Sequence, residues 1–148
     1  MTTYQISNRE NELNSLPNLV GIRIFLVEDE PDIAELLIFI LKTAGAEVMA
    51  FIDAEAALSM LELCHPDILL SNIKLPAHDG DWLIKQIRVH SSSLLRQLPA
   101  IAITSYTREV SSRKALDAGF DRFLVKFESP ETIVAEIVHL LSTSVRLH

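Results

Sequence analysis

The sequence predicts an α/β fold in which helices cover a parallel sheet. Three observations support this class. Short apolar runs alternate with longer stretches of helical period, which is typical of successive βα units. The chain has 148 residues, which is the length of one domain. Apolar residues make up 49% of the chain and charged residues 22%, so a sizeable core can form.

Five apolar runs predict the strands of this sheet. In chain order they are residues 22–27, 47–51, 67–71, 100–104 and 122–125. Most are too continuously apolar for a strand with one face in water, so we expect strands that are buried on both faces. Pro66 and Pro99 stand just before the third and fourth runs, outside the strand interiors, where proline would remove a ladder hydrogen bond.

Five segments between and after these runs predict helices, because apolar residues recur in them three and four positions apart. They are residues 31–44, 53–64, 81–90, 107–118 and 130–142. Pro31 and Pro130 stand where a helix can begin without losing a hydrogen bond. Asp53 is a residue type that caps helix N-termini, and Gly45 and Gly119 follow helices where a left-handed residue is favoured.

The beginning of the chain differs from the rest in composition. Residues 1–18 are polar and lack the continuous apolar stretch of a secretory signal. We therefore expect a polar tail over residues 1–20 and a single domain over residues 21–148. The most apolar run, residues 36–41, is far shorter than the roughly 20 residues that a membrane-spanning helix needs. A soluble protein with no membrane partner is expected.

Charge and cysteine content narrow the classes of partner and location. The chain has 13 Lys and Arg against 20 Asp and Glu, a formal net charge of -7. This charge repels phosphate backbones and anionic lipids, so no nucleic-acid partner is expected. The single cysteine, Cys64, cannot form an internal disulfide, which fits a cytoplasmic location.

Polar side chains stand at the carboxyl ends of four predicted strands, the edge at which open parallel sheets bind their ligands. In chain order they are Glu28, Asp29 and Glu30, then Asn72, Thr104 and Lys126. Each alone has a structural explanation; acids before a helix, for example, favour its positive end. Their coincidence at one edge of one sheet favours a site.

The chemistry of these side chains indicates what such a site would handle. Adjacent carboxylates form a hard oxygen cluster suited to Mg²⁺. A threonine hydroxyl and a lysine ammonium can receive the oxygens of a phosphoryl group bridged to that metal. The residue types therefore predict a phosphoryl-handling pocket.

Five separated motifs carry a resemblance to a known family: VEDEP (27–31), PDILLSNIKLP (66–76), DG (79–80), AITSY (102–106) and FLVK (123–126). From residue 22 to about residue 141, the chain resembles the CheY-like receiver domains of two-component response regulators. The resemblance implies a flavodoxin-like, doubly wound sheet of five parallel strands in the order 2-1-3-4-5, with helices on both faces. It also implies a signalling module that is not an enzyme, in which an aspartate at the third strand end accepts phosphate from a histidine kinase.

The resemblance also implies roles for particular residues. Glu28 and Asp29 correspond to the metal-binding acids, and the backbone carbonyl of Lys74 also faces the metal. Three further positions would serve the phosphate and the switch: Thr104 as the switch hydroxyl, Lys126 as the phosphate-pairing lysine and Phe123 as the aromatic that changes rotamer.

Two residues depart from the family pattern. Asn72 stands where the family has the accepting aspartate, and an amide has no anionic nucleophile at neutral pH. We therefore expect no phosphotransfer at this position, weak Mg²⁺ binding, and Lys126 paired with Glu28 or Asp29. Phe127 stands where the family commonly has a cis proline, so we expect a trans bond there.

The functional interpretation leaves alternatives open. Asn72 is either natural, which makes the chain a pseudo-receiver acting through protein contacts, or a substitution in an ordinary phospho-accepting receiver. From another class, a Mg²⁺-dependent phosphatase resembling the haloacid dehalogenase family would also use acids after the first strand, a hydroxyl and a lysine. Its nucleophile would fall at Glu28, where an aspartate is expected.

The expected partners are a histidine kinase or another signalling protein, and a second copy of the chain. By the resemblance, the pairing face would combine the fourth helix, fifth strand and fifth helix. Mixed charges on this face suit contacts that fix how two partners align, although they are equally compatible with a face that is merely solvated. The charged residues available on it are Arg108, Glu109, Arg113, Lys114, Asp117, Asp121 and Arg122.

Overall fold

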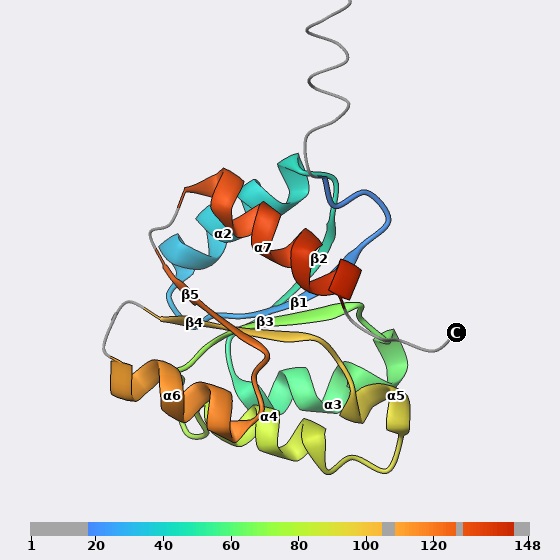
Figure 1. The fold of residues 1–148 in the computed structure, drawn as a ribbon, viewed down its shortest axis with the longest axis vertical. Helices are drawn as coiled ribbons and strands as arrows, with labels where there is room; N and C mark the ends of the chain where they lie inside the picture. Colours follow the sequence, from blue (N-terminus) through green and yellow to red (C-terminus); the bar gives the residue numbers. More distant parts are fainter. Residues whose placement is uncertain (1–17, 105–108, 127–128, 144–148) are drawn as a thin grey trace, which may run out of the picture.

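The computed structural model describes residues 18–104, 109–126 and 129–143. These residues form a sheet of five parallel strands in the order β2-β1-β3-β4-β5, with helices on both faces (Figure 1). The predicted fold class and strand order are therefore confirmed. No helix in these ranges has the length and apolar character needed to cross a membrane.

The strands lie within one residue of their predicted limits. They are β1 (Arg23–Val27), β2 (Glu47–Phe51), β3 (Ile68–Asn72), β4 (Ala100–Thr104) and β5 (Arg122–Val125). The helices are α2 (Pro31–Thr43), α3 (Ala54–Cys64), α4 (Gly80–Arg88), α5 (Ser93–Arg96), α6 (Glu109–Ala118) and α7 (Pro130–Thr143).

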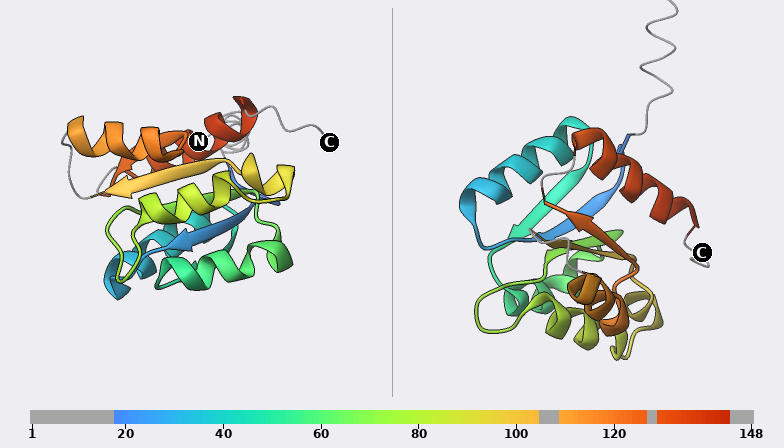
Figure 2. Two further views of the ribbon diagram at one scale, coloured as in Figure 1. Left: turned by 90° about the horizontal axis from the view of Figure 1, so that it is seen from below. Right: turned by 60° about the vertical axis from the view of Figure 1, so that its left-hand side comes forward.

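The sheet separates two apolar cores. Because successive side chains of a strand point to opposite faces, Ile24 and Leu26 of β1 pack toward α2 and α7, and Phe25 and Val27 pack toward α3, α4 and α6. Figures 1 and 2 show these helix layers on either side of the strands. The middle strands β3 and β4 are buried along their whole length, as expected for a sheet covered on both faces.

The expectation of burial is wrong for β2 and only partly right for the other edge strand, β5, in which Leu124 alone is buried. Glu47, Met49 and Ala50 are exposed, and Val48 and Phe51 are only partly buried. The reason is position: β2 lies at the edge of the sheet and has a neighbouring strand on one side only. The apolar sequence of β2 therefore does not predict how much of the strand is buried.

The connection between β3 and β4 differs from the prediction in two ways. Helix α4 begins at Gly80 because the side chain of Asp79 accepts a hydrogen bond from the Trp82 amide, and it ends at Arg88. A short helix, α5, follows and buries Leu95. A four-residue helix is too short to show a period, so the sequence did not reveal it.

The structure moves the start of the domain earlier than expected. Leu19, placed in the tail by composition, is fully buried, and its amide donates a hydrogen bond to the Ala44 carbonyl. Gly45, at φ +104°, allows this contact, because a Cβ there would lie 2.7 Å from a side-chain carbon of Val20. The rest of the expected tail, residues 1–17, lies outside the described ranges and stays a prediction.

Candidate functional site

The carboxyl ends of four strands bring the predicted polar residues together. Parallel register aligns these ends, with Val27 opposite Ser71 and Thr104 opposite Val125. Glu28 directly follows β1 and Lys126 directly follows β5, and Asn72 and Thr104 are the last residues of β3 and β4. Four of these side chains belong to buried residues, namely Glu28, Asn72, Thr104 and Lys126.

The side-chain amide of Asn72 lies among three oxygen atoms. Its Nδ2 is 3.0 Å from Glu28 Oε2, 2.9 Å from the Lys74 carbonyl oxygen and 3.4 Å from Asp29 Oδ1. The amide donates to all three groups, with two hydrogens shared among them. Asn72 therefore contacts both acids and the carbonyl that the resemblance assigns to a metal.

Lys126 forms a buried ion pair with Glu28. Its Nζ lies 2.7 Å from Glu28 Oε1, and the two side chains are 3% and 1% exposed. The exposed carboxylate of Glu30 lies farther away, at 3.9 Å from the same nitrogen. The pairing expected for Lys126 is thus made with Glu28. Because both groups are withdrawn from water, each depends on the other for compensation of its charge.

The remaining predicted residues lie around this pair. Thr104 is buried, and its carbonyl oxygen accepts a hydrogen bond from the Lys126 amide at 2.7 Å. Phe123 of β5 is partly buried against the core shared by α3, α4 and α6. Their proposed roles as switch residues stay predictions. Phe127, with its expected trans bond, lies outside the described residues, as do residues 105–108.

A close backbone approach shapes the loop that presents the Lys74 carbonyl. A Cβ on Gly80 would collide with the carbonyl oxygen of Asn72, and the Gly80 amide donates to the Ile73 carbonyl at 2.7 Å. Ala77 in the same loop adopts a left-handed conformation, with φ at +63°. The Asp79-Gly80 motif therefore folds the loop onto the end of β3.

The oxygen atoms of this site suit Mg²⁺ by chemistry, but their arrangement does not accommodate it. Two carboxylates and a carbonyl are hard oxygen ligands. They face the nitrogen of Asn72, which is a hydrogen-bond donor and cannot serve as a ligand in this orientation. Within the described ranges, no three or more His, Cys, Asp or Glu side chains are grouped so that they could hold a metal ion.

A buried carboxyl group near the site was missed at the sequence level. Asp81 in α4 is 4% exposed, and its Oδ1 has no hydrogen-bond partner among the described residues. Its Oδ2 lies 3.9 Å from Lys114 Nζ of α6. Burial raises the pKa of Asp81, and the nearby charge of Asp79 raises it further. No signal could have revealed this, because an aspartate in the first turn of a helix is usually solvated.

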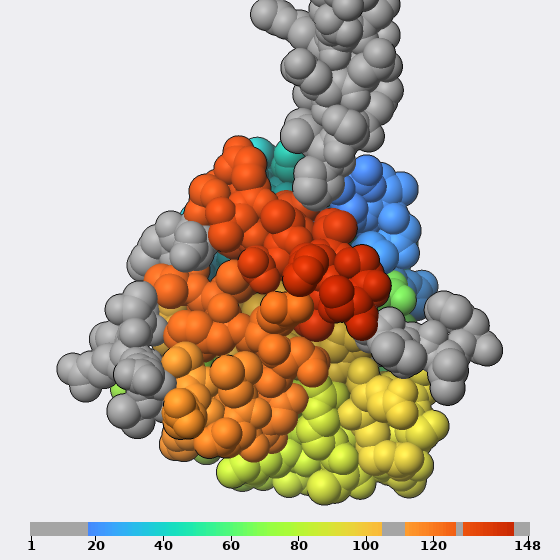
Figure 3. All heavy atoms as spheres, in the orientation of Figure 1, coloured from blue at the N-terminus to red at the C-terminus, as the bar shows by residue number. Residues whose placement is uncertain are grey.

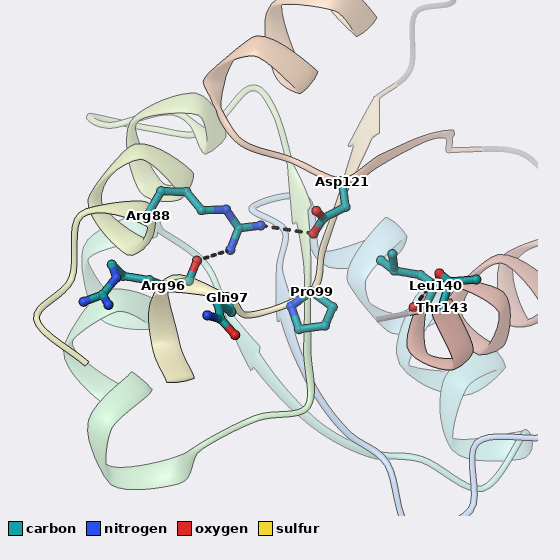
Figure 4. Close-up of a pocket in the computed structure, with 7 residues that line it drawn as sticks. All are labelled: Arg88, Arg96, Gln97, Pro99, Asp121, Leu140 and Thr143. Carbon is teal, nitrogen blue, oxygen red and sulfur yellow. Dashed lines mark hydrogen bonds and ion pairs between the residues drawn. The ribbon is translucent and has the colours of Figure 1, made fainter. Parts of the chain in front are cut away.

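A hollow lies at the opposite edge of the sheet, where β4 and β5 begin. Its volume is about 470 Å³, and Arg88 and Asp121 meet in it at 3.1 Å (Figure 4). Arg88 also donates to the carbonyls of Arg96, Leu98 and Gly119. Burial lowers the pKa of Arg88, and Asp121 opposes this shift. These contacts tie α4 to the starts of two strands, which is a structural role.

Curated proteins of similar sequence were found over most of the chain. It is 37% identical over 119 residues to an uncharacterized 14.6 kDa protein of Leptolyngbya boryana, covering 80% of this chain and 89% of that protein. It is 31% identical over 115 residues to the phosphate regulon transcriptional regulatory protein PhoB of Escherichia coli. That match covers 78% of this chain and 49% of PhoB, so the chain spans about half the length of this relative.

A solved structure and a family model agree with these relatives. The receiver domain of the sensor histidine kinase PA1611 from Pseudomonas aeruginosa, which has a magnesium ion coordinated in its active site cleft, superposes with a TM-score of 0.76. The two chains are 25% identical, and the match covers 84% of this chain and 100% of that one. The family model of the response regulator receiver domain matches residues 24–138. With the sheet order and the cluster at its carboxyl edge, this match shows that the chain belongs to the response regulator receiver domain family.

Proposed function

We propose that this receiver domain signals through a protein surface and does not accept phosphate at position 72. One observation carries the proposal: Asn72 ends β3, where the family's accepting residue is expected, and its side chain is a neutral amide bound to Glu28 and Lys74. An acceptor aspartate attacks phosphorus with a carboxylate oxygen, which an amide lacks. The domain would then act without catalysing a reaction.

Three other aspartates support the proposal because the side chain of each already accepts a hydrogen bond from a backbone amide. Asp53 and Asp79 accept hydrogen bonds from the first turns of α3 and α4. Asp67 lies at the opposite edge of the sheet, where its side chain accepts from the Arg23 amide at 2.8 Å. In the described part of the chain, these contacts argue against a substitute acceptor among the three.

The face made by α6, β5 and α7 is the proposed contact surface (Figure 3). Leu116 of α6 is 45% exposed, and Arg113, Lys114 and Asp117 are exposed around it. An apolar centre with a charged rim is typical of protein interfaces. Asp121 contributes less than expected, because it already pairs with Arg88. Arg122 contacts His139, Glu109 begins α6, and Arg108 lies outside the described residues.

This face would pair with a second copy of the chain, and a histidine kinase or another signalling protein would be its regulatory partner. No part of the proposal requires nucleic acid or a membrane. The single cysteine and the two-component context favour a cytoplasmic location. Mg²⁺ would bind weakly at most, because Asn72 contributes no charge to the acidic site and its nitrogen lies among the oxygen atoms that would hold the metal.

The proposal is tested by weighing the intact protein after exposure to Mg²⁺ and acetyl phosphate. We expect no added phosphoryl mass on the natural chain and one phosphoryl group on Asn72→Asp, because this variant restores the nucleophilic carboxylate. The variant is also the positive control for the reagent and the pocket. A phosphoryl gain on the unaltered chain would overturn the proposal.

The second candidate is an ordinary phospho-accepting receiver with an Asp-to-Asn substitution at position 72. The retention of Glu28, Asp29, Thr104 and Lys126 around this position favours it. The two candidates differ in the effect of phosphorylation: phosphorylated Asn72→Asp should change its self-association only if the chain is a working receiver apart from residue 72. A phosphatase of haloacid dehalogenase type is not proposed further, because the chain belongs to the receiver family and Glu28 is paired with Lys126.

A further inference from the structure

The acidic site after β1 receives its hydrogen-bond donors from the chain itself. Asn72 Nδ2 lies 2.9 to 3.4 Å from three oxygen atoms: Glu28 Oε2, Asp29 Oδ1 and the carbonyl oxygen of Lys74. On the other side of Glu28, Lys126 Nζ lies 2.7 Å from Oε1. The amide thus donates hydrogen bonds to three of these oxygen atoms, and the ammonium forms an ion pair with Glu28 Oε1, which has no hydrogen-bond partner among the described residues.

We propose that the Asn72 amide takes the place of a divalent cation among these oxygen atoms, so that a divalent cation does not stabilise the natural chain. The inference rests on the proposed function for the identity of the site and goes beyond it, because it concerns what stabilises the site. It predicts that the unfolding temperature of the natural chain is the same with and without Mg²⁺.

Hydrogen bonding and metal binding exclude each other at this point. Mg²⁺ requires oxygen ligands at about 2.0–2.1 Å in octahedral geometry. To accept it, Asn72 would have to withdraw its nitrogen and break its contacts with Glu28, Asp29 and Lys74. Turning the amide without a metal would place Oδ1 against three acceptors that have no hydrogen to donate. Asn72 is 6% exposed and Glu28 3% exposed, so water is poorly placed to compensate.

The charge of residue 72 decides whether a cation is needed. With asparagine, the site after β1 holds the carboxylates of Glu28 and Asp29, and the ammonium of Lys126 pairs with Glu28 at 2.7 Å. An aspartate at position 72 would add a third carboxylate in a partly desolvated site, and like charges at this distance repel. Asn72→Asp is therefore expected to gain stability from a divalent cation that does not stabilise the natural chain.

The experiment is thermal unfolding of the full chain in EDTA and in millimolar MgCl₂. The natural chain should unfold at the same temperature in both. Asn72→Asp should unfold at a lower temperature in EDTA and gain about 5 °C or more in MgCl₂, as expected for a ligand that binds the native state. Asn18→Asp, which adds the same charge at an exposed position, should behave as the natural chain does.

The outcome that overturns the inference is a stabilisation of the natural chain by MgCl₂ equal to that of Asn72→Asp. If the variant does not fold, NMR of the natural chain decides. The side-chain NH₂ signals of Asn72 should exchange slowly with water and stay unchanged when MgCl₂ replaces EDTA. Their displacement by MgCl₂ would overturn the inference. The phosphoryl-mass test is independent: a chain that binds Mg²⁺ yet gains no phosphoryl group would refute this inference and leave the proposed function standing.

Discussion

Glu28 and Lys126 carry opposite charges in a place where water reaches neither. Their side chains are 1% and 3% exposed, and the contact between them is 2.7 Å. The energy of such a pair is asymmetric: replacing both partners with neutral groups can cost little, but removing one leaves a buried charge without compensation. The family resemblance assigns Lys126 to a phosphoryl group, and in this chain its partner is Glu28.

Removing the ammonium should therefore destabilise the domain strongly. We expect Lys126→Met to lower the free energy of unfolding by about 3–5 kcal/mol, and Glu28→Gln in the same chain to recover part of that loss. Urea denaturation followed by circular dichroism measures both. The matched control is Lys42→Met, at an exposed position of α2, which should change stability by less than about 0.5 kcal/mol. A Lys126→Met variant as stable as this control would contradict the prediction.

Helices α4 and α6 meet at a carboxyl group that the fold does not fully satisfy. Asp81 is buried, one of its oxygens has no hydrogen-bond partner among the described residues, and the exposed Lys114 approaches only to 3.9 Å. Burial, followed by repulsion from Asp79, raises the pKa of Asp81 above 3.8, while Lys114 and Lys85 oppose the shift. The ionised form is therefore less stable in the folded chain than in the unfolded chain.

This shift determines how the stability of the α4–α6 contact depends on pH. Between 3.8 and the raised folded pKa, the unfolded chain binds fewer protons than the folded chain, so the contribution of Asp81 to stability falls as pH rises. At pH 7 we expect Asp81→Asn to be more stable than the natural chain, with an advantage that shrinks as the pH approaches 3.8. Thermal unfolding across this range measures the difference.

Asp117→Asn is the control, because it removes the same charge from an exposed position of α6. If the difference in stability between Asp81→Asn and the natural chain is the same at every pH, the pH dependence does not come from the buried carboxyl group of Asp81.

The domain presents its polar cluster at one edge of the sheet. Its proposed contact face lies along α6, β5 and α7 (Figures 1 and 3). If this face pairs two copies, the exposed Leu116 would be covered and Arg113 would meet charges of the other copy. Arg113→Glu should then weaken self-association about ten-fold or more, because a reversed charge at an interface creates repulsion. Sedimentation equilibrium over a concentration series measures the dissociation constant.

Lys42→Glu makes the same charge reversal on α2, which is not part of the proposed contact face, and should leave that constant unchanged. A natural chain that remains monomeric at every concentration would refute pairing through this face. Equal weakening by the two variants would instead indicate an effect of net charge alone.

Local periodicity was sufficient for most of the fold. The strands and most helix ends were predicted to within one or two residues, because the periods of side-chain burial and the positions of proline, glycine and capping residues are properties of short segments. The exposure of β2 and the existence of α5 were not predictable in this way. The first depends on which strand lies at the edge of the sheet, and the second involves too few residues to form a pattern.

The candidate site, like the fold, was predictable from the sequence only in part. Chain order already showed which polar residues end which strands, and that position 72 carries an amide in place of a carboxylate. The partners of that amide depend on distances between the ends of different strands and on the fold of the loop after β3. Three-dimensional packing alone places Asn72 Nδ2 among Glu28, Asp29 and Lys74 and leaves Lys126 to Glu28, since these contacts join segments that are far apart in the chain.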